Sequence, residues 1–139
     1  MYFKGEQETV SGTGKFMLIC PGNGKVTLHV MFDQPGLADE AMKMPTQSLL
    51  IDGKPFHIER YARAPNRMVI GDWVNALYSV DDDMLRRIRS AKTVGFALQR
   101  AKGDSYFFGF DGMPIADALP KLPGFLAVCG KATEKRTAR

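Results

Sequence analysis

Apolar and polar positions alternate most clearly in residues 25–33, where every second side chain is apolar. This period of two is typical of a β-strand with one buried face. Residues 15–20 form a shorter apolar segment, and the Pro-Gly-Asn-Gly sequence between the two segments favours a tight turn. The pattern therefore predicts an N-terminal β-hairpin. The side chains expected on the buried face of its second strand are Val26, Leu28, Val30 and Phe32.

A second hairpin is predicted in residues 47–61, where Asp52-Gly53 separates two β-rich runs. Pro55 cannot donate a backbone hydrogen bond, so the strand that contains it is expected at a sheet edge. The segment between the two hairpins, residues 34–46, is predicted to be a loop with one helical turn. Residues 63–66 are expected to turn, and residues 67–74 to form a strand with a bulge at Gly71.

The clearest helix is predicted at residues 82–91. Asp81 is the expected N-cap, because aspartates favour the positive end of the helix dipole and arginines follow toward the other end. Residues 93–99 and 105–110 are predicted strands. Residues 113–129 are predicted to form a short helix interrupted by two prolines.

This order of elements predicts the α+β class: one domain, mainly an antiparallel sheet of about seven strands, with two short helices packed on it. A chain of 139 residues fits a single domain. We expect a flexible segment at residues 1–14, the folded domain at 15–130 and a flexible basic tail at 131–139. No apolar run approaches the ~20 residues needed to span a bilayer.

The net charge is +4, and much of it lies in the C-terminal tail. A solvated terminus is one interpretation, and contact with nucleic acid is another. The basic side chains that would make such a contact are Arg86, Arg87, Arg89, Arg100, Lys131, Lys135, Arg136 and Arg139. The aromatic run SYFFGF lacks the flanking basic residues of an RNA-binding sheet, so we expect its aromatic side chains in the core.

Cys20 and Cys129 are the two cysteines, and each ends an apolar segment. Their wide separation excludes a CxxC redox or zinc motif. They can be two core thiols in a reducing compartment, or one disulfide that ties the first strand to the last helix. Their placement, one near each end of the folded body, favours the disulfide, and a disulfide would imply an oxidising compartment.

Catalytic and metal-binding patterns are missing from the sequence. There is no GxSxG motif, no phosphate-binding GxxxxGK[ST] loop and no metal-ligand spacing around either histidine. We therefore expect no enzyme activity, no metal and no cofactor. Strand parity suggests that one sheet face carries a binding surface. Its candidate residues are His29, His57, Tyr61 and Trp73.

The segments KFMLIC and KVTLHVMFD, followed by VDDDMLRRIRSAKTVGFALQ and GDSYFFGFDGMPIADALPKLPGFLAVCG, resemble a known group of proteins. Over residues 15–130 the chain resembles the type VI secretion-associated accessory family of Gram-negative envelope proteins. Its C-terminal half is also similar to invasion-associated locus B proteins. The resemblance implies a periplasmic or secreted protein, a Cys20–Cys129 disulfide and a non-enzymatic accessory role in binding another protein.

Residues 1–15 lack the apolar run of a signal peptide. Under the envelope hypothesis, the signal has been removed from this chain. The alternative hypothesis is a cytoplasmic or phage-borne inhibitor or immunity-type protein that binds another protein. A nucleic-acid-binding protein ranks third.

Overall fold

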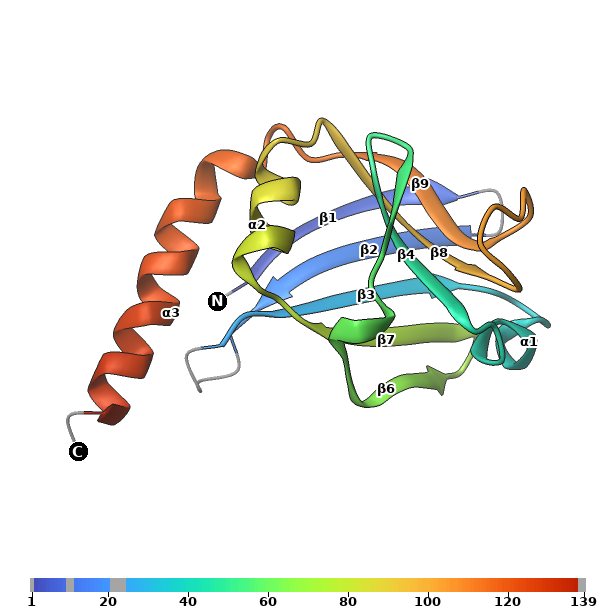
Figure 1. Cartoon of the computed structure of the whole chain (residues 1–139), viewed down its shortest axis with the longest axis horizontal. Coiled ribbons are helices and arrows are strands. Elements are labelled where there is room, and N and C mark those ends of the chain that lie inside the picture. The colour runs from blue at the N-terminus through green and yellow to red at the C-terminus, as the bar shows by residue number, and fades with distance from the viewer. Residues whose placement is uncertain (1, 10–11, 21–24, 138–139) are drawn as a thin grey trace.

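The structure is a computed structural model that describes residues 2–9, 12–20 and 25–137, with side chains at residues 14–20 and 25–129. These residues form nine strands in two antiparallel sheets (Figure 1). Sheet A consists, in spatial order, of β1 (Tyr2–Thr9), β2 (Gly12–Ile19), β3 (Thr27–Asp33), β7 (Trp73–Ser79) and β6 (Ala62–Ile70). Sheet B consists of β5 (Lys54–His57), β4 (Thr46–Ile51), β8 (Thr93–Gln99) and β9 (Phe108–Pro114).

The helices stand at the two ends of these sheets (Figure 1). Helices α2 (Asp82–Arg89) and α3 (Leu122–Thr137) lie at one end, and the short helix α1 (Ala38–Met42) lies at the other. Two 3₁₀ turns, η1 (Glu59–Tyr61) and η2 (Leu119–Lys121), complete the elements of the described chain. The predicted α+β class, mainly antiparallel, is confirmed.

One hydrophobic core joins the inner faces of both sheets. The ring of Phe96 from sheet B lies 6.2 Å from that of Phe32 and 5.8 Å from that of Tyr78, both from sheet A. The hydroxyl of Tyr78 donates to Oε1 of Gln47, and its burial raises the pKa of Tyr78 above the ordinary value. A buried hydroxyl is tolerated here because it has this partner.

The two sheets also meet where β2 and β1 approach β9. Gly14 of β2 faces inward, and a Cβ there would overlap the ring of Phe110 from β9. The missing side chain thus allows the close approach of sheet A to sheet B at this point.

Several sequence predictions are confirmed. Strands β2 and β3 form the N-terminal hairpin, although its turn at residues 21–24 lies outside the described residues. The inward side chains Leu28, Val30 and Phe32 are fully buried. Helix α2 begins after Asp81, whose Oδ1 accepts the backbone N–H of Met84 at 2.9 Å.

The Asp52-Gly53 hairpin is confirmed, with β5 at the edge of sheet B as Pro55 predicted. Oδ1 of Asp52 accepts the backbone N–H groups of Thr93 at 2.9 Å and Lys92 at 2.8 Å. These two hydrogen bonds lower the pKa of Asp52 and attach the turn to the start of β8.

Both terminal segments differ from the prediction. Residues 1–14, expected to be loose, contain β1 and the start of β2, because a backbone ladder with a neighbouring strand does not require apolar side chains. Residues 131–137, expected to belong to a flexible tail, continue α3. Ala, Glu, Lys and Arg in this segment are good helix formers, and no proline stops the helix.

The predicted single strand at residues 67–74 is wrong. The chain forms a hairpin there: β6 ends at Ile70, β7 begins at Trp73, and Gly71 lies in the turn with φ +64° instead of in a bulge. The turn predicted at residues 63–66 lies inside β6, where the pairing with β7 shifts register and the peptide bond before Pro65 is cis.

The last two elements are also displaced. Strand β9 begins at Phe108 and runs to Pro114, so residues 105–107 belong to a loop. Helix α3 begins at Leu122 instead of residue 113. Pro120 lies in η2, and Pro123 occupies the first turn of α3, where its missing N–H leaves no hydrogen bond broken. The two strands beyond the predicted seven are β1 and the second strand formed where the predicted strand at residues 67–74 divides into β6 and β7.

Candidate functional site

The four residues predicted to share one face lie on both sheets. His29 of β3 and Trp73 of β7 stand on the outer face of sheet A. His57 belongs to β5 at the edge of sheet B, and Tyr61 in η1 is buried. The prediction of a single shared face is therefore wrong, because the chain crosses from one sheet to the other between residues 57 and 62.

The outer face of sheet A carries an apolar surface that extends over four strands. Strand register places Met17 beside His29 and Leu77, Met31 beside Asn75 and Met68, and Trp73 beside Ile70. The intervening residues point inward and form the core. We call this surface the Met–Trp face. It is made of Met17, Met31, Met68, Ile70, Trp73 and Leu77.

These side chains are accessible even though they are apolar. Ile70 is 63% exposed, and the other five are partly exposed. The described helices stand at the ends of the sheets instead of covering this face (Figure 1). His29 and Asn75 lie between these apolar side chains in the register, so the surface mixes apolar and polar groups. Exposed apolar groups with polar neighbours mark candidate interaction sites.

Polar groups on the same face are paired with one another. Nε2 of His29 lies 2.9 Å from Oδ1 of Asn75. The ammonium of Lys15 lies 5.4 Å from the centre of the Trp73 ring, a cation–π contact. Arg63 donates to the hydroxyl of Thr27. These contacts hold the polar side chains and Trp73, and leave the methionines as the adaptable part of the surface.

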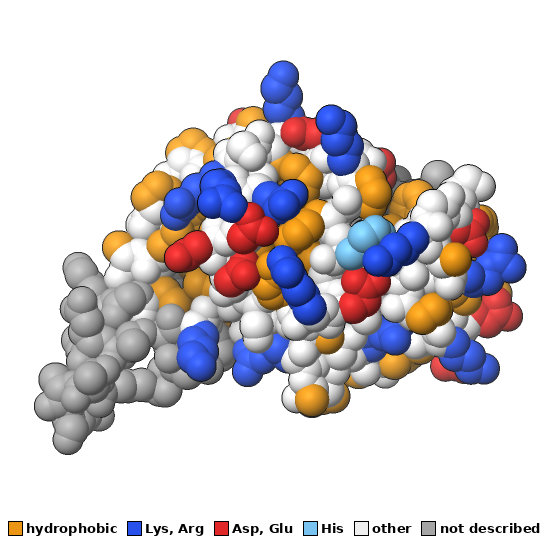
Figure 2. All heavy atoms as spheres, viewed as in Figure 1, with side chains coloured by type: hydrophobic (Ala, Val, Ile, Leu, Met, Phe, Trp, Pro, Cys, Tyr) orange, Lys and Arg blue, Asp and Glu red, His pale blue; other side chains and the backbone are white. Residues whose placement is uncertain are grey.

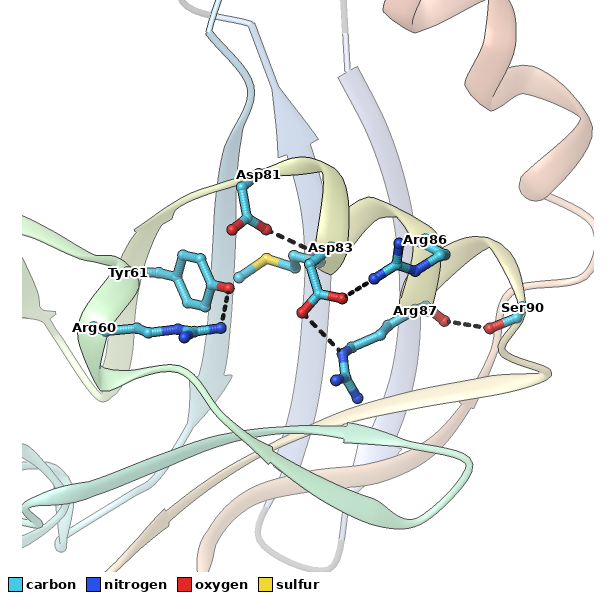
Figure 3. A network of polar contacts seen from close by, with 8 residues as sticks. Arg60, Tyr61, Asp81, Asp83, Arg86, Arg87 and Ser90 are labelled. Atoms are coloured by element: carbon cyan, nitrogen blue, oxygen red, sulfur yellow. Dashed lines mark hydrogen bonds and ion pairs between the residues drawn. The ribbon is translucent and has the colours of Figure 1, made fainter.

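The predicted basic residues of α2 lie beside acidic ones. Basic and acidic side chains gather over α2 on the face shown in Figure 2. Asp83 binds Arg86, and it binds Nε of Arg87 at 3.3 Å (Figure 3). Burial disfavours the charged form of Asp83, but the hydrogen bonds from both arginines outweigh it and lower its pKa.

The other contacts of arginines near α2 also join residues of this chain to one another. The guanidinium of Arg87 lies 4.1 Å from the centre of the Phe56 ring, and Arg60 donates to the hydroxyl of Tyr61 at 2.6 Å. Burial raises the pKa of Tyr61. Arg89 is exposed on the same helix. The side chains of Lys131, Lys135, Arg136 and Arg139 lie outside the described residues.

The two cysteines meet at the end of the molecule near α2 and α3. Cys20 and Cys129 are joined as a disulfide with their Cα atoms 5.8 Å apart, within the usual range for such a bond. Cys129 is 3% exposed and lies on the same side of α3 as Leu122 and Phe125, which pack into the core. The disulfide therefore attaches α3 to the end of β2.

The outer face of sheet B is different in character. Nδ1 of His57 lies 2.8 Å from the hydroxyl of Ser48, which is fully buried. His57 lines a groove of about 260 Å³ together with residues of the loop between β8 and β9, among them Asp104 and Phe107. Because Ser48 is covered, its hydroxyl serves to orient the imidazole.

Alternation in residues 25–33 places Met31 on the outer face with His29, as observed, but the sequence did not reveal Met17 and Met68 there, nor the exposure of Tyr106. Phe108 and Phe110 are buried as predicted, but Tyr106 is 58% exposed. The signal for the outer face was the segment KFMLI, whose unbroken apolar run indicates a strand with two apolar faces.

Within the described residues, no cluster of histidine, cysteine, aspartate and glutamate has the arrangement of a metal site. No helix of the described chain combines the length and the apolar character required to cross a membrane. Comparisons with models of protein families, with curated proteins and with solved structures find no significant match. The resemblance to envelope accessory proteins therefore stays a prediction.

Proposed function

We propose that this protein acts by binding another protein through the Met–Trp face. The observation that supports this most strongly is an apolar outer face that spans β2, β3, β7 and β6 and contributes nothing to the core. Methionine-rich surfaces adapt their shape to a partner, and tryptophan is among the residues that contribute most to binding. In this proposal the chain carries no catalytic residue.

The expected partner presents apolar side chains surrounded by carboxylates. The charged residues that border the Met–Trp face include Lys15 and Arg63, and one carboxylate, Asp33, which lies opposite Trp73 in the strand register. The chain as a whole carries a net charge of +4. Acidic groups around an apolar centre would complement both properties.

The proposed location is the periplasm or another envelope compartment. The Cys20–Cys129 disulfide fits an oxidising environment, where such bonds persist. A secretion-associated accessory role is the finer part of this proposal, and it rests on the sequence resemblance alone. The cytoplasmic inhibitor hypothesis predicts two free thiols in the protein isolated from its own cells, so thiol alkylation of that protein separates the two locations.

The experiment places a photo-crosslinking amino acid at Leu77 in the full chain, with Asp82 on α2 as the control position. After irradiation in an extract of the cells that make the protein, we expect one partner captured from Leu77 and absent from Asp82. The purified partner should then bind the unmodified chain, with affinity that falls as salt is raised.

A double variant, Met31→Glu/Met68→Glu, tests whether the partner binds through the Met–Trp face. The two carboxylates should abolish binding of the purified partner, because they place charge in the apolar centre and oppose an acidic margin. Val128→Glu makes the same kind of change at a 45% exposed position of α3 and should leave binding intact. Equal binding by all three proteins would refute the proposal, and self-association through this face would replace it with a homodimer.

A further inference from the structure

A pocket of about 350 Å³ opens at the α1 end of the molecule, separate from the Met–Trp face. The loop between β8 and β9 separates it from the His57 groove, since Tyr106 lines the pocket and Phe107 lines the groove. The volume lies within the range of small-molecule sites. The residues that line the pocket are Glu40, Met44, Leu98, Arg100, Tyr106 and Phe108.

The floor of the pocket is apolar. Leu98 is fully buried and Phe108 is 4% exposed, so both belong to the core and hold fixed positions. Met44 is partly exposed and follows the end of α1. The innermost part of a ligand in this pocket therefore lies against hydrocarbon, which favours an apolar group there.

Tyr106 stands at the opening in a defined position. Its ring meets Phe108 edge-on, with centroids 5.4 Å apart and planes at 82°. Its backbone N–H donates to Oδ1 of Asp104 at 3.2 Å. The Tyr106 side chain is 58% exposed, but its ring contact with Phe108 and its backbone hydrogen bond to Asp104 hold it in place. It therefore offers a ligand a preformed binding surface.

Of the two charged side chains that line the pocket, one has an ion-pair partner and the other has none among the described residues. Nε of Arg100 lies 3.3 Å from Oδ2 of Asp104, so these two charges offset each other. Glu40 is exposed on α1, and within the described part of the chain its carboxylate makes no ion pair or side-chain hydrogen bond. The unpaired charge at this pocket is therefore negative.

We propose that this pocket binds an organic ammonium ion carried on an apolar stem. The stem would lie on Leu98 and Phe108, and the ammonium would lie between the Glu40 carboxylate and the Tyr106 ring. Ammonium groups bind the faces of aromatic rings, and a nearby carboxylate adds to that attraction. The same chemistry is found in a free amine and in a lysine side chain of a bound protein.

Three probes that share one aromatic body test the charge preference: 4-phenylbutylamine, 4-phenyl-1-butanol and 4-phenylbutyrate. Binding to the full, oxidised chain is followed by the amide NMR shifts of Tyr106, Arg100 and Met44. We expect the amine to bind about tenfold more tightly than the alcohol, and the carboxylate to bind most weakly.

Two pairs of variants assign the effect to residues. Glu40→Gln should reduce amine affinity about tenfold and leave alcohol affinity unchanged, since it removes only the charge. Asp39→Asn makes the same change one position earlier on α1, outside the pocket, and should have no effect. Tyr106→Ala should weaken all three probes, whereas Tyr106→Phe keeps the ring and should bind as the parent does.

The outcomes separate the alternatives. A lysine source is indicated if N-acetyl-lysine methylamide binds as tightly as the amine, and a free amine is indicated if it binds more weakly. Equal binding of the amine and the carboxylate, shifts that avoid the pocket, or equal effects of Glu40→Gln and Asp39→Asn would each overturn the assignment. The pocket shares no lining residue with the Met–Trp face, so failure here leaves the proposed protein binding standing, and the reverse also holds.

Discussion

Sheet A and sheet B are alike on their inner faces and different on their outer faces. Both contribute large apolar side chains to one core, such as Phe16 and Phe32 from sheet A and Phe96 from sheet B. Outside, sheet B carries mostly small and polar residues, with Nδ1 of His57 beside the Ser48 hydroxyl, and its one large apolar side chain, Leu50, is buried and lines the groove together with the loop between β8 and β9. Sheet A carries methionines and Trp73 on the surface.

The difference shows what the fold does and does not require. One buried face for each sheet builds the core, and the apolar groups on the outer face of sheet B, Leu50 and Ala97, are buried beside the chain's own loop between β8 and β9. The second apolar face of sheet A therefore has a cause outside the fold of this chain, and we assign it to a partner. Substitutions on the inner and on the outer face of sheet A should therefore differ in their effects, and so should substitutions in the two sheets. Equal effects would contradict this assignment.

The largest effect is expected from removal of the disulfide that attaches α3 to sheet A. Cys20→Ala/Cys129→Ala should lower the free energy of unfolding by up to about 4–5 kcal/mol, because the bond closes a loop of 109 residues in the unfolded chain. Urea unfolding of the variant and the parent measures the difference. The Met–Trp face should survive, so the emission of Trp73 in the folded variant should match the parent. A variant as stable as the parent would contradict this role of the bond.

Neighbouring residues on opposite faces of β2 provide the sharpest comparison. Leu18→Ala should cost about 2–5 kcal/mol, because Leu18 is fully buried and its removal leaves a cavity. Met17→Ala, one residue earlier on the outer face, should cost about 1 kcal/mol or less. Thermal or urea unfolding gives both values. Similar losses from the two substitutions would mean that the outer face supports the fold.

The contact between the sheets is tested at Gly14. Gly14→Ala should destabilise the protein by about 1–3 kcal/mol, because the new methyl group overlaps the ring of Phe110. Phe110→Leu alone is also destabilising because Phe110 is fully buried, but the double variant should lose less than the sum of the two single losses, and a double-mutant cycle measures this coupling. Strict additivity of the two changes would show that β2 and β9 do not pack together here.

The smallest effect concerns the hairpin of sheet B and depends on pH. Hydrogen bonds to Thr93 and Lys92 lower the pKa of Asp52 in the folded state below its ordinary value of 3.8. The charged form therefore adds stability above that value, and this contribution is lost as pH falls through the folded pKa. Asp52→Asn keeps the hydrogen-bond acceptor and fits the positive φ of 51°.

The parent should thus be more stable than Asp52→Asn near neutral pH, and the difference should shrink as the pH falls below 3.8 and through the lowered pKa of folded Asp52. Urea unfolding across this range compares the two proteins. A difference that stays constant with pH would assign the effect of Asp52 to turn geometry instead of charge.

Sequence reasoning succeeded where one local signal dominates. Strict alternation identified β3 and its buried face, and Asp81 marked the start of α2. It failed at Gly71-Asp72, where a two-residue Gly-Asp turn between apolar runs was interpreted as a bulge. A two-residue Gly-Asp segment between apolar runs is a hairpin signal in the sequence, and the structure pairs the flanking residues Ile70 and Trp73 accordingly.

The candidate surface was only half predictable, for a physical reason. Met17 lies in a run that is apolar on both faces, so period-two alternation is absent and the outward face cannot be identified. Tyr106 is in phase with Phe108 and Phe110, yet the strand begins only at Phe108, and Gly109 has a positive φ of 142°. The placement of Cys20 and Cys129 near the two ends of the folded body favours a disulfide, and the structure joins the two residues.

The central claim is that a partner protein covers the Met–Trp face, and Trp73 is the only tryptophan of the chain. The most direct measurement is the single ¹⁹F NMR resonance of the full chain labelled with 5-fluorotryptophan, recorded as the purified, crosslink-identified partner is added. Binding through this face predicts a shifted and broadened resonance for the parent and an unchanged one for Met31→Glu/Met68→Glu. An unchanged parent resonance while the complex forms would contradict the claim, because the partner would then bind elsewhere.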